Sequence, residues 1–287
     1  MLIHKDTASL EYFDFGRYIS PLFTGRVRSK ETDHELDFPL QPVIEYGRIE
    51  NLEQLLVFLA THPRLTHGDG NMYASVCDEV NYESTKSFIS SMQDRQFIRY
   101  AAFKKDATNC ARFVTDSLIA GVTNLDIRRK LIKSNRFTPS TIGNVVISDT
   151  VGKVFKVSDK GEIDVFTSSV GRLNRVLFLD RLNGHQPNLS GNLEPNANKV
   201  KHENAQWLPG IGGGAWFELH NINHHIEYRF RRVSPLGNID VDGIYQLKEK
   251  GFDINSNYEF THYSNCKVLN VKQSDRLYRF EYLRKHN

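Results

Sequence analysis

The sequence predicts an α+β fold of two domains: a small α+β domain over residues 1–140 and a mostly antiparallel β domain, a sandwich or barrel, over residues 141–287. Helix and strand signals alternate before residues 135–145, whereas nearly every later segment has the composition of a strand. Many short strands at near-regular spacing, without helical periods between them, are typical of a sandwich or barrel.

The composition supports a folded chain and excludes several classes of protein. With 39% hydrophobic and 25% charged residues, the 287-residue chain can bury a core. The formal charge of +3 comes without a basic block, so we expect no nucleic-acid partner. The apolar runs are far shorter than the ~20 residues of a membrane span, and the first residues hold no secretory signal core. We therefore expect a cytoplasmic protein, and its oligomeric state is left open.

The amino-terminal elements are predicted from apolar spacing and end signals. Aromatic and β-branched residues at even steps predict a strand over 9–21 that ends in a turn, and polar residues over 24–42 predict a loop or a short edge segment. A leucine stripe predicts a helix over 51–60, with Asn51 as its cap and Pro63 as its stop.

The rest of the first domain continues this alternation. Asn109 has the character of an N-cap and Gly121 that of a C′ residue, so they bound the last helix. The predicted segments are a strand over 72–80, a helix over 82–95, a strand over 97–103 and a helix over 108–121.

The second domain is predicted from closely spaced strand segments and turn signals. Residues 183–204, rich in Asn, Gly and Pro, indicate a long excursion. The predicted strands are 145–148, 151–157, 162–167, 174–180, 215–219, 225–233, 243–247, 258–262, 267–272 and 276–283.

Cys110 is the residue with the clearest chemical signal. A cysteine in the first turn of a helix lies where unpaired backbone N–H groups stabilise a thiolate, which is the nucleophilic form. The same N–H groups can stabilise a developing oxyanion. Most free cysteines are small buried apolar residues, and that interpretation stays open for Cys110. Cys77 and Cys266 lack a helix-start environment, and we interpret both as structural.

The residues around Cys110 resemble a known motif. Thr108-Asn-Cys-Ala-Arg-Phe-Val114 is similar to the Asn-Cys-x-x-Phe-Val motif of circularly permuted papain-like proteins, which include lecithin retinol acyltransferases and NlpC-type peptidases and amidases. The wider chain resembles an uncharacterised bacterial family with a Tyr-Phe-Asp-Phe-Gly-Arg-Tyr segment, a His-Gly-x-Gly turn and a Trp-Leu-Pro-Gly-Ile-Gly-Gly-Gly segment. The first resemblance implies a permuted papain-like fold for residues 1–140 and cysteine peptidase, amidase or acyltransferase chemistry.

The same resemblance implies a catalytic histidine that precedes the cysteine. His67, in the Thr-His-Gly-Asp-Gly turn, is the best internal candidate, with Asp69 to orient it. His4 is an alternative, and a third is that the residue lies upstream of Met1 or has been lost. His67 and Asp69 also suit a plain polar turn.

Four further residues are candidates for substrate binding. Asp14 and Arg17 flank the aromatic residues of the first strand, and Asn109 and Arg112 flank Cys110. Arg112 would favour a thiolate or bind a substrate carboxylate, although early helical arginines are often only exposed. His220, His224 and His225 lack the cysteine or carboxylate pair of a zinc set, so we predict no metal and no cofactor.

These observations predict a cysteine-dependent amide or ester hydrolase, or an acyltransferase, with Cys110 as nucleophile and a peptide, amide or acyl-ester substrate. The β domain would bind substrate or a partner, or cover the cleft. The alternative is a catalytically degenerate binding protein on the same scaffold, because a fold can persist when its site does not. A third interpretation places the function in the β domain.

Overall fold

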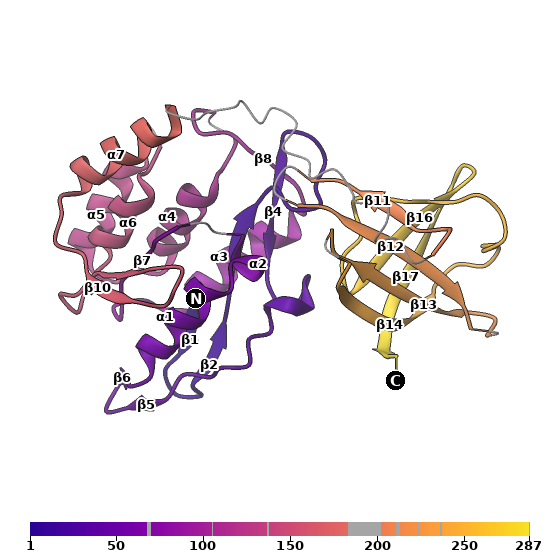
Figure 1. Cartoon of the computed structure of the whole chain (residues 1–287), viewed down its shortest axis with the longest axis horizontal. Coiled ribbons are helices and arrows are strands. Elements are labelled where there is room, and N and C mark those ends of the chain that lie inside the picture. The colour runs from indigo at the N-terminus through magenta and orange to yellow at the C-terminus, as the bar shows by residue number, and fades with distance from the viewer. Residues whose placement is uncertain are drawn as a thin grey trace. The chain divides into compact units, whose positions relative to one another are not determined.

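The computed structural model divides the chain into two compact units, and the boundary between them is crossed more than once (Figure 1). The first unit comprises Met1–Phe15 and Phe38–Leu189, and the second comprises Gly16–Asp37 and Ser190–Asn287. The expected boundary at residue 140 falls between two helices of the first unit. The structure describes residues 1–67, 70–104, 106–136, 138–182, 202–210, 213–222, 224–235 and 237–286.

Helices make up most of the regular secondary structure of the first unit (Figure 1). Three of them confirm the helices predicted over 51–60, 82–95 and 108–121. Asn81 caps the second of these, because its side chain accepts a hydrogen bond from the Ser84 backbone N–H at 2.8 Å. The described helices are α1 (Leu52–Thr61), α2 (Pro63–Thr66), α3 (Tyr82–Asp94), α4 (Cys110–Gly121), α5 (Leu125–Ser134), α6 (Thr141–Ile147) and α7 (Val170–Leu182).

The strands of the first unit are short. The strand predicted over 9–21 is split in two, and those predicted over 72–80 and 97–103 shrink to two or three residues. A three-stranded antiparallel sheet has the order β10-β9-β7, and its core packs against α1. The strands are β1 (Leu2–His4), β2 (Ser9–Glu11), β3 (Asp14–Gly16), β5 (Ile44–Glu45), β6 (Arg48–Ile49), β7 (Met72–Ala74), β8 (Ile98–Arg99), β9 (Phe155–Val157) and β10 (Ile163–Val165).

Two strands predicted for the second domain, over 145–148 and 174–180, are wrong. Residues 145–147 form the end of α6, and residues 174–180 lie within α7. A serine caps the start of each helix. The Ser140 hydroxyl accepts from the Gly143 N–H at 2.9 Å, and the Ser169 hydroxyl accepts from the Arg172 N–H at 3.2 Å. These apolar runs are too short for their period to separate a strand from a buried helix, and the caps decide for the helix.

Gly121 has a different role from the predicted one. It is the last residue of α4 rather than a C′ residue beyond the helix. A Cβ atom there would lie 1.8 Å from Thr85 Oγ1 and 2.8 Å from the Asn81 carbonyl oxygen, both at the start of α3. The glycine therefore permits the close approach of α3 and α4, which fixes the helix that carries Cys110.

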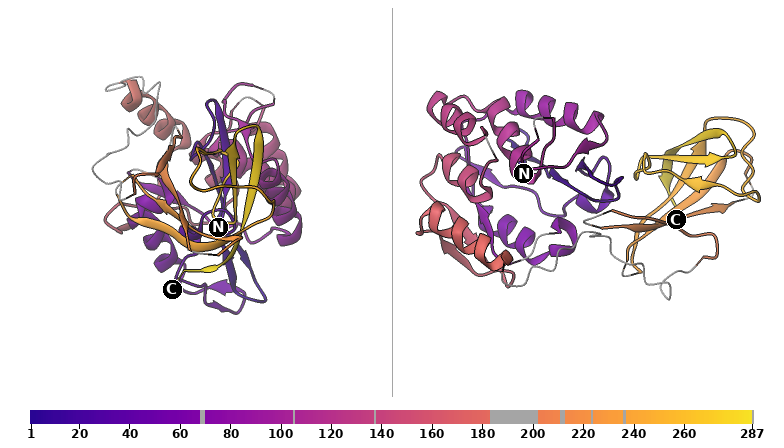
Figure 2. Two further views of the ribbon diagram at one scale, coloured as in Figure 1. Left: turned by 90° about the vertical axis from the view of Figure 1, so that its right-hand side faces the viewer. Right: turned by 90° about the horizontal axis from the view of Figure 1, so that it is seen from above.

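The second unit is built on one antiparallel sheet of the order β11-β12-β13-β14-β17-β16-β15, which curls on itself (Figure 2). The Gln206 side chain joins its two edges: its Nε2 donates to the Tyr258 carbonyl and its Oε1 accepts from the Phe260 N–H, both at 2.8 Å. The mostly antiparallel β domain is thereby confirmed as a nearly closed barrel. Its strands are β11 (Gln206–Leu208), β12 (Ala215–Asn221), β13 (Glu227–Val233), β14 (Ile239–Leu247), β15 (Glu259–Phe260), β16 (Val268–Gln273) and β17 (Arg276–Lys285).

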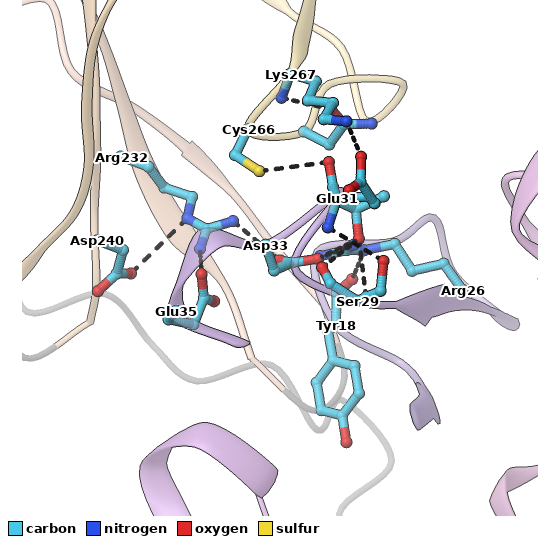
Figure 3. A network of polar contacts seen from close by, with 12 residues as sticks. Tyr18, Arg26, Ser29, Glu31, Asp33, Glu35, Arg232, Asp240, Cys266 and Lys267 are labelled. Atoms are coloured by element: carbon cyan, nitrogen blue, oxygen red, sulfur yellow. Dashed lines mark hydrogen bonds and ion pairs between the residues drawn. The ribbon is translucent and has the colours of Figure 1, made fainter. Parts of the chain in front are cut away.

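A buried network of charges ties residues 16–37 to this barrel (Figure 3). This segment holds β4 (Thr24–Arg28) and the 3₁₀ turn η1 (His34–Leu36). Arg26 binds the Asp33 carboxylate with two hydrogen bonds of 2.6 and 2.8 Å. Arg232 of β13 donates to Asp33 at 3.0 Å and to Glu35 at 2.5 Å. Burial alone would raise the pKa of Asp33, but the attraction of Arg26 and Arg232 lowers it well below its usual range.

Candidate active site

Cys110 is the first residue of α4, and it is exposed. Asn109 caps the helix as predicted, because its Oδ1 accepts a hydrogen bond from the Arg112 N–H at 2.9 Å. The Asn109 side chain is buried, and its Nδ2 donates to Thr138 Oγ1 at 3.4 Å. The cap therefore fixes the helix start, where unpaired N–H groups favour a thiolate.

The Tyr100 hydroxyl donates a hydrogen bond to the Cys110 sulfur, with 3.9 Å between the oxygen and Sγ. Residues 99–101 pair with Thr108, which brings this tyrosine back beside the helix start. Its ring stacks on Phe15 with centroids 5.8 Å apart, and Phe15 also contacts Phe113 of α4. Sequence reasoning missed Tyr100. Its signal was a tyrosine within the predicted strand that precedes the cysteine helix.

Arg112 binds the loop that leads into α4. Its guanidinium donates to the backbone carbonyls of Ala102 at 2.7 Å, Ala107 at 3.0 Å and Lys104 at 3.4 Å. These bonds hold the backbone at residues 102, 104 and 107, which precede Cys110 in the chain. A role for Arg112 in binding substrate remains a prediction.

The candidate histidines lie at other places in the first unit. His67 is exposed and ends α2 in the left-handed conformation, with φ of 50°. Asp69 lies outside the described residues. His4 belongs to β1, where its Nδ1 accepts from the Thr7 N–H at 3.3 Å and its ring meets Tyr82 at 4.7 Å between centroids. In the described part of the chain, the hydrogen bond to Cys110 Sγ comes from Tyr100 and not from a histidine.

The remaining substrate-binding candidates lie near the point where the chain leaves the first unit. Asp14 begins β3, is half-buried, and accepts a hydrogen bond from the Tyr12 hydroxyl at 3.1 Å. Arg17 follows β3 and is half-buried. A role for Asp14 or Arg17 in binding substrate remains a prediction.

The other two cysteines lie in different surroundings from Cys110. Cys77 is half-buried against the cluster around Val122, and burial raises the pKa of its thiol. Cys266 is fully buried in the barrel, where burial raises its pKa to about 12. Neither thiol ionises readily near neutral pH, so Cys110 is the accessible thiol of the described chain.

The described residues contain neither a metal-binding cluster nor a membrane-spanning helix. No group of three or more His, Cys, Asp or Glu among them is arranged to hold a metal ion. His220 instead binds the buried Glu218 carboxylate at 3.2 Å. In the same part of the chain, no helix is both long and apolar enough to span a membrane.

Comparison with known families gives two matches that divide the chain. Residues 1–127 are similar to the family described as type VI secretion system effector TseH-like, and this match includes Cys110, His67 and His4. Residues 205–283 are similar to the family described as DUF6695 C-terminal domain, and this match lies within the barrel. Neither a curated protein nor a solved structure was found to match the chain.

Proposed function

We propose that the first unit is a cysteine-dependent hydrolase or acyltransferase that acts on an amide or ester bond, with Cys110 as its nucleophile. The observation that carries this proposal is an exposed cysteine at the first residue of a helix whose start is fixed by a buried cap. The resemblance of the Cys110 motif to that of permuted papain-like enzymes supports it, and Cys110 lies within residues 1–127, the region similar to TseH-like type VI secretion system effectors.

The chemistry would run in two stages. The Cys110 thiolate attacks the carbonyl carbon, and the carbonyl oxygen becomes an oxyanion beside the N–H groups at the start of α4. The bond to the leaving amine or alcohol then breaks, and a protonated base donates the proton that this group takes away. Water, or another acceptor, next attacks the thioester, the base removes its proton, and the thiolate is released. Hydrolysis results when water is the acceptor.

His67 and His4 are the proposed alternatives for the base, and Asp69 would orient His67. Both histidines precede the cysteine in the chain, as in permuted papain-like proteins. A general base must come within hydrogen-bond reach of the group it serves, directly or through one water, and free enzymes often hold this contact loosely. The variants His67→Ala and His4→Ala distinguish the two.

The family match also bears on where the protein acts. Type VI effectors are secreted proteins. We propose that this protein is such an effector, delivered out of the cell that makes it. The cytoplasmic location expected from the start of the sequence would then describe only the protein before delivery.

A second candidate function is that of a catalytically degenerate binding protein. One observation favours it: the described hydrogen bond to Cys110 Sγ comes from a tyrosine hydroxyl rather than from an imidazole. A cysteine without a base would keep the fold and an accessible thiol but would not turn over substrate.

Alkylation by iodoacetamide between about pH 5 and pH 9 tests the proposal, because an activated thiol reacts well below the pKa of ~8.5 of a free one. Labelling is read at each cysteine by mass spectrometry, so the half-buried Cys77 serves as an internal control. We expect Cys110 to react quickly near pH 6, Cys110→Ser to abolish this reaction, and either His67→Ala or His4→Ala to slow it about tenfold.

Turnover is measured next on a panel of chromogenic amides and esters. The histidine whose removal slows alkylation should also be needed for turnover. If Cys110 reacts like an ordinary thiol and neither histidine variant changes its rate, the hydrolase proposal fails and the binding protein takes its place.

A further inference from the structure

A cavity of about 630 Å³ lies beside α4 in the first unit. This volume is within the usual range of small-molecule sites, roughly 300–1,000 Å³. Its walls come from α3, the residues around β8, residues 103, 104 and 106–108, α4 and the residues that follow α5. Cys110 and Tyr100 are not among its lining residues, whereas Arg112, two residues after Cys110, is.

The floor of the cavity is apolar. Met92 of α3 and Ile98 of β8 line it with side chains that are 6% and 3% exposed, and the half-buried Phe88 lies beside them. This surface suits an aliphatic or aromatic group of a ligand, because such contact removes apolar area from water.

Four cations line the cavity: Arg95, Lys104, Arg112 and Arg136. Arg112 donates to the backbone carbonyls of Ala102, Lys104 and Ala107, which leaves Arg95, Lys104 and Arg136. All three are exposed. Within the described residues, none of them forms an ion pair with a carboxylate, and the Arg95 guanidinium donates a hydrogen bond to the Met92 sulfur at 3.6 Å. They are therefore available to a ligand carboxylate, for which arginine is the preferred partner.

A carboxylate, Asp116 of α4, lines the same cavity and is half-buried. The Asn135 amide fixes it by donating a hydrogen bond of 2.5 Å. Burial raises the pKa of Asp116, and this effect outweighs the opposing effects of Asn135 and Arg112. An ammonium group beside Asp116 would offset that cost of burial. Asp106, the other acid of the lining, is exposed among the cations.

We infer that this cavity binds a small amphoteric molecule, an α-amino acid with an apolar side chain. The ammonium group binds Asp116, the side chain covers Met92 and Ile98, and the carboxylate meets Arg95, Lys104 and Arg136. A simple anion would face the half-buried acid, and a simple cation would face four basic side chains. This binding does not depend on the proposed hydrolase activity.

Calorimetric titration of the full chain tests the inference with L-leucine, L-methionine and L-phenylalanine, and with analogues that each lack one contact. N-acetyl-leucine lacks the ammonium charge, leucinamide lacks the carboxylate, and glycine lacks the side chain. We expect at least one of the three apolar amino acids to bind, and each leucine analogue to bind about tenfold more weakly than leucine or not at all.

Variants locate the site. Asp116→Asn keeps the shape and an acceptor for Asn135, and it should weaken binding about tenfold, as should Arg136→Gln. Arg128→Gln removes an exposed cation of α5 outside the cavity and should leave binding unchanged. Circular dichroism establishes that each variant is folded.

Three results would overturn the inference: no heat from any of the three amino acids up to about 10 mM, equal binding of leucine and N-acetyl-leucine, or equal losses for Arg128→Gln and Arg136→Gln. Cys110→Ser should bind as the natural chain does. Binding by the chain together with unreactive Cys110 would overturn the hydrolase proposal alone, and reactive Cys110 without binding would overturn this inference alone.

Discussion

The hydroxyl of Tyr100 lies 3.9 Å from the sulfur of Cys110. Tyr100 directly follows β8, before the loop that leads into α4. Tyr100→Phe removes the hydroxyl and leaves the ring that stacks on Phe15. Because the thiolate loses a donor, we expect alkylation of Cys110 at neutral pH to slow by roughly threefold to tenfold. Tyr73→Phe, on β7, is the matched control and should react as the natural chain does. An unchanged rate for Tyr100→Phe would show that the hydroxyl does not act on the sulfur.

Asn109→Ala removes the cap of α4 and should lower the free energy of unfolding by about 1 kcal/mol. It should also slow alkylation of Cys110, because the first turn of the helix loosens. Asn124→Ala is the matched control: Asn124 caps α5 through the N–H groups of Asp126 and Ile127, so its loss should cost similar stability without changing the alkylation rate. Urea unfolding and cysteine labelling are measured on both. Equal rates in the two variants would contradict a specific role for the Asn109 cap.

Gly121→Ala tests the close approach of α3 and α4. The new Cβ would clash with Thr85 and with the Asn81 carbonyl, so we expect a loss of at least about 2 kcal/mol in the free energy of unfolding. Gly171→Ala in α7 meets no atom within 4 Å and should raise the free energy of unfolding by up to about 1 kcal/mol, because alanine favours a helix. Urea unfolding distinguishes the two variants. If Gly121→Ala left the free energy of unfolding unchanged, the packing argument would be refuted.

Asp33→Asn breaks the buried network of the second unit. Arg26 and Arg232 would then remain buried with a neutral partner, which should cost about 3–5 kcal/mol of unfolding free energy. Asp126→Asn removes an exposed carboxylate that pairs with Arg129 at 2.9 Å and should cost at most about 1 kcal/mol. Chemical unfolding of both variants measures these two losses of unfolding free energy. A small loss for Asp33→Asn would mean that the network does not stabilise the unit.

Asp240 gives the second unit a distinctive pH dependence. Burial raises the pKa of Asp240 to about 6, despite the attraction of Arg232 at 3.8 Å. Between about pH 4 and pH 6 the folded protein holds a proton that the unfolded chain has lost, so this group's contribution to stability falls as pH rises. Asp240→Asn should therefore be more stable than the natural chain at about pH 7, by up to about 2 kcal/mol, and equal to it near pH 4.

Asp242, on the same strand, should show the opposite sign. The hydrogen bond from Arg229 lowers the pKa of Asp242, so its contribution is present above the unfolded pKa and is lost as pH falls. Asp242→Asn should be less stable than the natural chain near neutral pH, and the difference should shrink in acid. Urea unfolding at several pH values measures both slopes. An Asp240→Asn variant that is destabilised near neutral pH would indicate that the pair with Arg232 dominates.

The elements that could be predicted from the sequence carry their signals locally. A capping residue and an apolar stripe lie within one segment for α3 and α4, and an apolar stripe alone marks α1. A cysteine beside a cap needs no distant contact to be recognised. The barrel strands from β12 to β17 were predictable for the same reason, since turn residues separate them, whereas β11 (Gln206–Leu208) was missed. Asn51 shows the limit of such signals: its side chain binds the backbone of residues 41 and 43 instead of capping α1.

The features that could not be predicted depend on contacts between distant segments. The apolar runs of α6 and α7 are too short to show a period, and α6 is helical while packed against α4 and α5. Tyr100 comes near Cys110 because residues 99–101 pair with Thr108, a contact that no local pattern encodes. The inclusion of residues 16–37 in the second unit depends on pairs such as Arg232 with Asp33, which are 199 residues apart in the chain.

That last arrangement limits how evolution can exchange the two parts of this protein. The family similarities over 1–127 and 205–283 suggest two modules joined end to end, which a single genetic crossover between them could shuffle. Yet the barrel takes Arg26, Asp33 and Glu35 from within the first of these regions. A barrel transplanted by such a crossover would arrive with Arg232 buried and its acidic partners left behind. The two regions are therefore expected to be inherited together, and a new amino-terminal partner would have to bring its own equivalent of residues 16–37.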